Sequence, residues 1–272
     1  MDCCIFVHYG LANRLLAPDH DYVNKLSCLF SEVIVVTNER EFELHDLPNS
    51  VKLKFVKNGG YDFGMFFKVF IELNLSSLDR LALVNDSNFL LGDLGEIMEK
   101  GKLLRSDFWG IIDSLEKPWF STHIDNYHLQ SHFLVWEKGS FPILSSFIDE
   151  INIKEFLEES SPKKLRRKVI NSWEIGLSQY FMSKKYFPEA LFQTKILAAK
   201  LGKKPTLNLT MTDPEFLLSQ GYPLFKKKYI ARNNFLKRLL YPKKRWEYLL
   251  KTHSPKSVFI QDWIDQLKRP KN

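Results

Sequence analysis

The sequence has few cysteines and no long hydrophobic run. Its three cysteines, Cys3, Cys4 and Cys28, show no CxxC spacing, which disfavours both a disulfide scaffold and a structural zinc site. No apolar stretch approaches the ~18–20 residues that a helix needs to span a bilayer. The apolar run at residues 3–7 is too short for a signal peptide and follows no basic segment. We therefore expect a cytoplasmic protein without a membrane span.

Two common nucleotide-binding motifs are also missing. No GxGxxG follows the first predicted strand and no GxxxxGK[ST] occurs anywhere, so dinucleotide-binding and P-loop interpretations are weak. The composition itself is ordinary for a globular protein, with 44% apolar and 26% charged residues among 272. A chain of this length and composition can bury a core and form one or two domains.

Short β-rich runs alternate with helical patterns in the first half of the chain. We expect strands at residues 3–9, 33–37, 51–56, 81–85, 107–112 and 133–136, and helices at 21–31, 62–73 and 93–100. Asp62 is the expected N-cap of the second helix. Residues 141–186 have a mostly helical pattern, interrupted by a charged loop at 158–168. This alternation predicts an α/β fold with a Rossmann-type, mostly parallel sheet flanked by helices, which binds ligands at the carboxyl ends of its strands.

Positive charge is concentrated near the C-terminal end. Residues 221–272 contain 14 Lys and Arg but only three acids, a charge of +11, whereas the preceding residues sum to −4. Apolar residues at helical spacing lie between these charges, as at 235–240. The contrast predicts a domain over residues 1–220 followed by a basic amphipathic segment over residues 221–272.

A basic amphipathic segment is suited to an anionic membrane surface. The residues we expect to make that contact are Lys226, Lys227, Lys228, Lys237, Arg238, Lys243, Lys244 and Arg245. The alternative is a helix packed on its own domain with a solvated basic face. Nucleic acid is not an expected partner, because the rest of the chain has no recognition motif.

The strongest candidate for chemistry follows the fourth predicted strand, where the hydrophobic run 81–84 leads into Asn85, Asp86 and Ser87. A carboxylate at that edge of a sheet can take part in catalysis or hold Mn²⁺ or Mg²⁺ on a diphosphate. Because Asp86 has no second acid beside it, metal-independent chemistry stays open. Alternatively, Asp86 caps the turn that follows it.

A second candidate is the segment Asn58-Gly59-Gly60-Tyr61-Asp62. Its paired glycines allow a ligand to approach the backbone closely, and the helix N-terminus that follows favours an anion. A bare turn is the alternative. Lys68, on the same helix, is a candidate counter-ion for a diphosphate, or else an ordinary solvent-facing residue.

Further candidates are polar or aromatic residues near predicted strand ends. Gln130, Ser131 and His132 form a polar trio that enters a strand, although a buried core histidine is the favoured interpretation of His132 on its own. Glu174, beside Trp173, is a candidate general base or a surface helix acid. The remaining pocket candidates are His8, Tyr9 and Trp109.

Taken together, these segments resemble the rhamnan synthesis protein F family of bacterial polysaccharide glycosyltransferases. The resemblance rests on the segments 58–64, 84–87, 107–110, 129–135 and 173–177, which occur in the family's order. It implies a GT-A-like fold and a glycosyltransferase that uses a nucleotide-diphospho-sugar, with dTDP-rhamnose as one candidate donor. The acceptor would be a cell-surface polysaccharide or O-antigen, or its lipid-linked precursor, at the cytoplasmic face of the membrane.

The resemblance also implies roles for individual residues. Asn58, Tyr61, Asp62 and Asp86 would line the donor site, Gln130, Ser131 and His132 would lie near the transferred sugar, and Glu174 would deprotonate the acceptor hydroxyl. The competing hypothesis is a non-catalytic module that recruits a glycan-assembly complex to the membrane.

Overall fold

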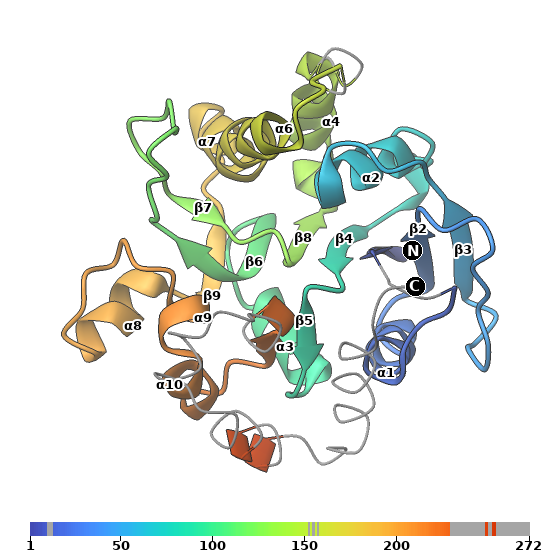
Figure 1. The fold of residues 1–272 in the computed structure, drawn as a ribbon, viewed down its shortest axis with the longest axis horizontal. Helices are drawn as coiled ribbons and strands as arrows, with labels where there is room; N and C mark the ends of the chain where they lie inside the picture. Colours follow the sequence, from blue (N-terminus) through green and yellow to red (C-terminus); the bar gives the residue numbers. More distant parts are fainter. Residues whose placement is uncertain are drawn as a thin grey trace.

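The structure is a computed structural model that describes residues 1–9, 13–151, 153, 156, 158–228, 248, 249, 252 and 253. It has an α/β architecture in which helices cover both faces of a central sheet (Figure 1). The first half contains β1 (Asp2–His8), α1 (Ala17–Ser27), β2 (Glu32–Thr37), β3 (Val51–Phe55), α2 (Tyr61–Phe70), β4 (Arg80–Asn85), β5 (Asn88–Leu90) and α3 (Leu94–Lys102).

The second half is richer in helices. Its strands are β6 (Phe108–Ser114), β7 (His128–Leu129), β8 (Phe133–Glu137), β9 (Glu189–Phe192) and β10 (Leu224–Lys226). Its helices are α4 (Phe141–Glu150), α6 (Pro162–Lys168), the π-helix η3 (Val169–Ile175), α7 (Gly176–Ser183), α8 (Thr194–Lys200), α9 (Leu209–Thr212) and α10 (Pro214–Ser219).

The main sheet has eight strands in the order β3-β2-β1-β4-β8-β6-β7, with β9 beside β6. The strands from β3 to β4 are all parallel, whereas β8 runs antiparallel to both of its neighbours. The mostly parallel sheet flanked by helices is therefore confirmed. Its central strands are continuous apolar runs because helices bury both of their faces, and every residue of β1 after Asp2 is buried.

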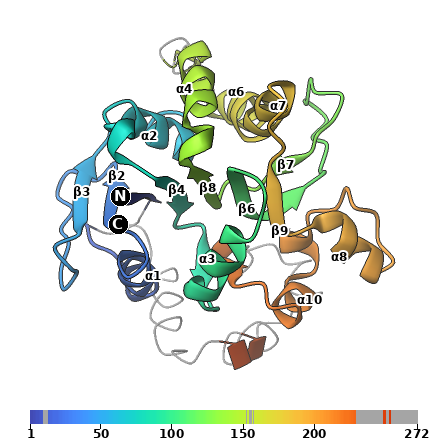
Figure 2. The ribbon, with the colours of Figure 1, turned by 180° about the vertical axis from the view of Figure 1, so that it is seen from behind.

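Two hydrophobic clusters form the core, one on each face of the sheet. One cluster lies under α2, α4 and α7, and the other lies under α1 and α3. The same two helical layers are seen from behind in Figure 2. Because helices cover both faces of these parallel strands, the carboxyl edge of the sheet is where side chains of several strands can meet.

The structure departs from the predicted elements in two helices. α1 begins at Ala17, four residues earlier than expected, because Pro18 is accommodated in its first turn. The expected charged loop at 158–168 is wrong over most of its length: Pro162–Lys168 forms α6, and Ser161 caps it by accepting a hydrogen bond from the Lys164 N–H. α6 continues through η3 into α7.

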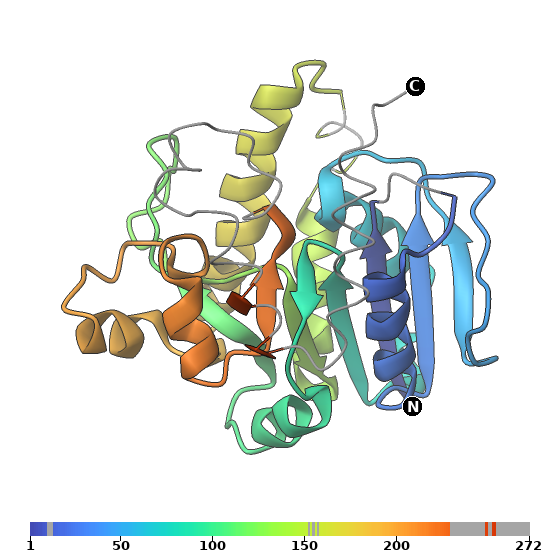
Figure 3. The ribbon, with the colours of Figure 1, turned by 60° about the horizontal axis from the view of Figure 1, so that its bottom comes forward.

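Residues just after position 220 pack within the domain rather than away from it. β10 pairs antiparallel with β5, and the two strands lie side by side in Figure 3. The N–H of Lys227 donates to the carbonyl of Ser87 over 3.0 Å. The composition change at residue 221 therefore does not mark the end of the packed chain. Most of the predicted basic segment, including Lys237, Arg238, Lys243, Lys244 and Arg245, lies outside the described residues.

A buried hydrogen bond ties this returning chain to the sheet. The hydroxyl of Tyr222 and Nε2 of His132 are 2.7 Å apart, and both side chains are buried. Tyr222→Phe leaves the histidine nitrogen without this partner, so we expect the free energy of unfolding to fall by about 1–3 kcal/mol in urea denaturation. Tyr180→Phe, at an exposed hydroxyl that donates to Glu150, is the control and should change stability by less than ~0.5 kcal/mol.

Candidate functional site

The carboxyl edge of the sheet brings Asp86 against the end of β1. β1 and β4 are parallel neighbours with Val7 opposite Asn85, so their ends meet. The Oδ2 atom of Asp86 accepts a hydrogen bond from the Tyr9 N–H over 3.0 Å and lies 3.2 Å from Nδ1 of His8. The Asp86 side chain remains 16% exposed, whereas that of His8 is buried. Three residues proposed from sequence are thus joined in one cluster.

The turn after β4 is capped by Asn85 and not by Asp86. Oδ1 of Asn85 accepts hydrogen bonds from the N–H of Ser87 over 3.1 Å and from its hydroxyl over 2.5 Å. The capping alternative for Asp86 is therefore wrong, because its carboxylate faces β1. This leaves the Asp86 carboxylate available at the sheet edge.

Asp62 does not cap α2 as predicted. The helix begins at Tyr61 after Gly60, which adopts a left-handed conformation with φ 78°, and Asp62 already lies in the first turn. Its carboxylate instead accepts a hydrogen bond from Nδ2 of Asn85 over 2.7 Å. Burial raises the pKa of Asp62 to about 7, and the neighbouring carboxylates of Asp86 and Glu174 contribute to the increase. Three acids therefore lie around one centre.

The raised pKa of Asp62 predicts a pH-dependent stability. Because the folded-state pKa of about 7 exceeds the ordinary value of 3.8, the protonated carboxyl stabilises the folded protein below about pH 4, and this contribution is lost as the pH rises towards 7. Each pH unit in that window is worth up to about 1.4 kcal/mol. We expect Asp62→Asn, which keeps the shape and an acceptor oxygen, to flatten the fall in stability between pH 4 and 7 in urea titrations. An unchanged slope in this variant would contradict the assignment.

Glu174 faces the same centre from the helical layer. It lies in η3, and π-helical turns are frequent at functional sites. The Ser131 hydroxyl donates to Oε1 of Glu174 over 2.9 Å. The predicted general base and one member of the polar trio are therefore in direct contact.

Trp173 is buried beside Glu174 and explains the glycine at position 60. A Cβ atom at Gly60 would lie 2.6 Å from the Trp173 ring, so only glycine fits there. The structure thus gives Gly60 a packing role, and its contact with a donor stays a prediction. Tyr61 is partly exposed and donates from its hydroxyl to the carbonyl of Pro162 over 3.0 Å, while Asn58 is exposed at the start of this segment.

Three other predicted site residues have mainly structural surroundings. His132 is buried against Tyr222, which fits the core-histidine alternative, and burial lowers its pKa well below the ordinary value. Trp109 is buried against Gly101 of α3. Strand pairing through β8 and β4 aligns Trp109 with Cys4, which lies well before the carboxyl end of β1. Nζ of Lys68 donates to the Lys57 carbonyl over 2.8 Å, after β3. Trp109 and Lys68 are therefore not brought to the acidic centre.

Two lysines predicted to touch a membrane point into the domain instead. Nζ of Lys226 donates to Oε1 of Gln130 over 3.0 Å, and burial lowers its pKa to about 8. Nζ of Lys227 forms an ion pair with Asp19 over 2.5 Å, and both side chains are buried. The membrane prediction is wrong for these two residues, because β10 and the residue after it pack back against β5 and Ser87. Lys228 is exposed.

Asp19 is the site residue that the sequence analysis missed. It lies in the first turn of α1, and ligand atoms of His8, Asp19 and Asp86 lie within 4.8 Å of one another. The available signal was its position in the first helix after the first strand, since that helix starts near the carboxyl edge. Its partner Lys227 is 208 residues away, which no local pattern indicates.

The same cluster allows a test of the expected Mn²⁺ or Mg²⁺. Imidazole and carboxylate groups are suitable ligands, and the buried Nε2 of His8 has no hydrogen-bond partner in the part of the chain that the structure describes. However, the Lys227 ammonium is already in contact with Asp19, so a divalent ion on this cluster would share a carboxylate with another cation and be repelled by it. With Lys227 in place, the residues do not fit a resident divalent ion.

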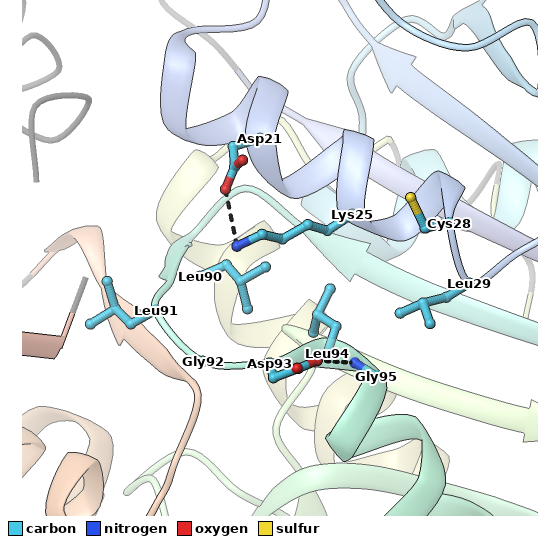
Figure 4. A pocket seen from close by; sticks show the side chains of 10 residues that line it. All are labelled: Asp21, Lys25, Cys28, Leu29, Leu90, Leu91, Gly92, Asp93, Leu94 and Gly95. Carbon is cyan, nitrogen blue, oxygen red and sulfur yellow. Dashed lines mark hydrogen bonds and ion pairs between the residues drawn. The ribbon is translucent and has the colours of Figure 1, made fainter. Parts of the chain in front are cut away.

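A cavity of about 450 Å³ is lined by residues outside this cluster (Figure 4). It lies between α1 and the segment that joins β5 to α3. An ion pair between Asp21 and Lys25 borders it, with 3.1 Å between the charged atoms, and most of the other lining side chains are apolar. No residue predicted for the site lines this cavity.

The fold and the site define an α/β protein with an acidic, lysine-containing cluster at the carboxyl edge of a mostly parallel sheet. The family model of rhamnan synthesis protein F matches residues 33–261, so the chain belongs to this family, as its motifs predicted. No curated protein sequence matches the chain.

Two solved structures are similar to the chain at low identity. One is a putative glucose-1-phosphate thymidylyltransferase from Bacillus anthracis in complex with a sucrose, with 9% identity and a TM-score of 0.37 over 69% of this chain and 85% of that chain. Another is HddC from Yersinia pseudotuberculosis, with 11% identity and a TM-score of 0.35 over 60% of this chain and 86% of that chain. Among the described residues, no helix is long and apolar enough to cross a bilayer.

Proposed function

We propose that the protein is a glycosyltransferase that moves a sugar from a nucleotide-diphospho-sugar onto a bacterial cell-surface polysaccharide or O-antigen acceptor. The observation that carries this proposal is the convergence of Asp62, Asp86 and Glu174 at the carboxyl edge of the sheet, in a member of the rhamnan synthesis protein F family. Parallel α/β sheets bind their ligands at that edge.

The contacts support a division of roles within this site. An inverting sugar transfer needs a base for the acceptor hydroxyl, and the leaving diphosphate needs positive charge or backbone N–H groups. Glu174, oriented by the Ser131 hydroxyl, is the proposed base. Asp86, held by the Tyr9 N–H and beside His8, is proposed to orient the donor sugar. Lys226 is the proposed contact for the diphosphate, because its ammonium lies at the same edge.

Donor binding is tested first by thermal stabilisation. The full chain is heated with dTDP, UDP, GDP or CMP and the corresponding sugar nucleotides, each with EDTA, Mg²⁺ or Mn²⁺. Ligand at 100 times its Kd should stabilise the fold by about 2.7 kcal/mol. Stabilisation by one nucleotide supports the proposal and identifies the donor class, with dTDP-rhamnose as the first candidate from the family's name. No stabilisation by any of them favours the non-catalytic recruitment module.

We further propose that the protein works at the inner face of the cell membrane. The support is the +9 charge of residues 228–272, which leaves out Lys226 and Lys227, since each basic residue near an anionic surface contributes about 1 kcal/mol. The full chain should sediment with phosphatidylglycerol vesicles but not with phosphatidylcholine vesicles. Replacing Lys237, Arg238, Lys243, Lys244 and Arg245 with glutamate should abolish this binding, and unchanged sedimentation would contradict the proposal.

A further inference from the structure

We propose that Lys226 supplies at the donor site the positive charge that a divalent ion supplies in metal-dependent transferases, and that Lys227 balances the charge of the acidic cluster, so that this site binds a nucleoside diphosphate without metal. The inference rests on the proposed function and names the groups that would replace the metal. It follows from where β10 and the residue after it place two consecutive lysines.

The two ammonium groups reach different partners from the chain that packs against the turn after β4. Lys226 is opposite Asn88 in the β10–β5 pair, and the Lys227 N–H donates to the Ser87 carbonyl. From there, the side chain of Lys227 reaches Asp19 on α1, whereas that of Lys226 reaches Gln130. Two consecutive lysines, the last residue of β10 and the residue after it, therefore come next to the turn that carries Asp86.

Lys227 balances charge inside the acidic cluster. Asp19 and Asp86 place carboxylate oxygens within 4.8 Å of each other, and Asp19 is buried. A buried charge needs a partner of opposite charge. A group of carboxylates also repels a diphosphate unless nearby cations balance the negative charge of the carboxylates. Lys227 is held where it can balance this negative charge. Its side chain is only 10% exposed, and its ammonium lies 5.5 Å from the Phe89 ring centre. We assign it as a positioning residue, because it acts through Asp19.

Lys226 has the contacts expected of a group that meets the anion itself. It is held by the neutral amide oxygen of Gln130, and the carboxylates of Glu174 and Glu116 stabilise its charged form. A hydrogen bond from an ammonium to an uncharged amide leaves its charge available to a phosphate. Burial lowers the pKa of Lys226 to about 8, so the group is mostly charged at neutral pH.

The experiment measures Kd for dTDP, UDP and GDP by calorimetry, with the full chain in EDTA and in Mn²⁺. We expect wild type to bind one of these nucleotides equally well in both buffers. Lys227→Met should weaken binding at least tenfold in EDTA and recover it with Mn²⁺, because the vacated His8–Asp19–Asp86 cluster can then accept the ion. Lys226→Met should weaken binding in both buffers. Lys203→Met, which removes an ion pair with Asp213 outside the site, should bind as wild type.

The outcomes separate this inference from the proposed function. Wild-type binding that requires Mn²⁺, or a folded Lys227→Met variant that binds as wild type in EDTA, overturns the inference and leaves the glycosyltransferase proposal intact. No binding of any of these nucleotides in either buffer contradicts the proposed function itself.

A second variant covers the case in which Lys227→Met does not fold. The double variant Asp19→Asn and Lys227→Met removes both charges of the buried pair. It should bind the nucleotide in EDTA within about threefold of wild type and gain nothing from Mn²⁺, since the cluster then lacks one carboxylate. Loss of binding in a folded double variant would overturn the charge-balancing role of Lys227.

Discussion

The Asp86→Asn variant is expected to transfer sugar about 10²–10³-fold more slowly than wild type while keeping its fold, the usual effect of removing one preorganised charge at a transition state. Asn at this position retains an oxygen for the Tyr9 N–H but loses the charge beside His8 and the donor. Transfer is measured with the nucleotide sugar identified by thermal stabilisation, and folding by circular dichroism.

The matched control removes a carboxylate from the opposite edge of the same sheet. Asp79 immediately precedes β4, is 65% exposed and pairs with the N-terminal ammonium and Lys138. Asp79→Asn should leave the transfer rate within about twofold of wild type, because it lies at the other end of the strand. A folded Asp86→Asn variant with normal transfer would remove Asp86 from the site.

The largest expected effect on stability comes from Trp173→Ala. Its ring is fully buried, stacks on Phe156 with 4.2 Å between ring centres, packs edge-on against Phe67 and fills the space beside Gly60. Removing it leaves a large cavity, so we expect the free energy of unfolding to fall by about 3–5 kcal/mol in urea denaturation. Glu174 should also lose its position, because the same η3 turn carries both residues.

Trp119→Ala is the control for this second prediction. Trp119 is 79% exposed and contacts Arg167 through a cation–π interaction with the guanidinium 4.5 Å from the ring centre. Its replacement should cost less than about 1 kcal/mol, since an exposed cation–π contact is weak. Equal losses of unfolding free energy in the two variants would show that Trp173 does not stabilise the core in the way that its packing indicates.

The strands of the sheet were predictable because burial on both faces requires continuous apolar runs. β1, β2, β4 and β8 are all such runs, and each was expected within one or two residues of its observed bounds. The short β5, β9 and β10 were missed because three or four residues carry too little periodicity to be distinguished from loops. Their existence depends on pairing partners that are distant in the chain.

The candidate site was predictable only in part, for a related reason. Asp86 and Glu174 were proposed because each stands out locally, one at a strand end and the other beside a tryptophan. Asp62 was also proposed, but its hydrogen bond with Asn85 replaced the expected cap. Lys226 and Lys227 were predicted to contact a membrane. A local run of lysines does not show whether each side chain faces solvent or a carboxylate of the same protein.

By itself, the sequence determined the class of fold, the family and the carboxylate at the end of the fourth predicted strand, since these depend on hydrophobic pattern and short motifs. Only the tertiary structure decided which charges meet. The ion pair between Asp19 and Lys227 joins residues 208 positions apart, and it exists because β10 returns to pair with β5. Coulomb interactions depend on distance in space, which a local pattern does not contain. The fold therefore decided that a lysine from the far end of the chain meets the acidic cluster.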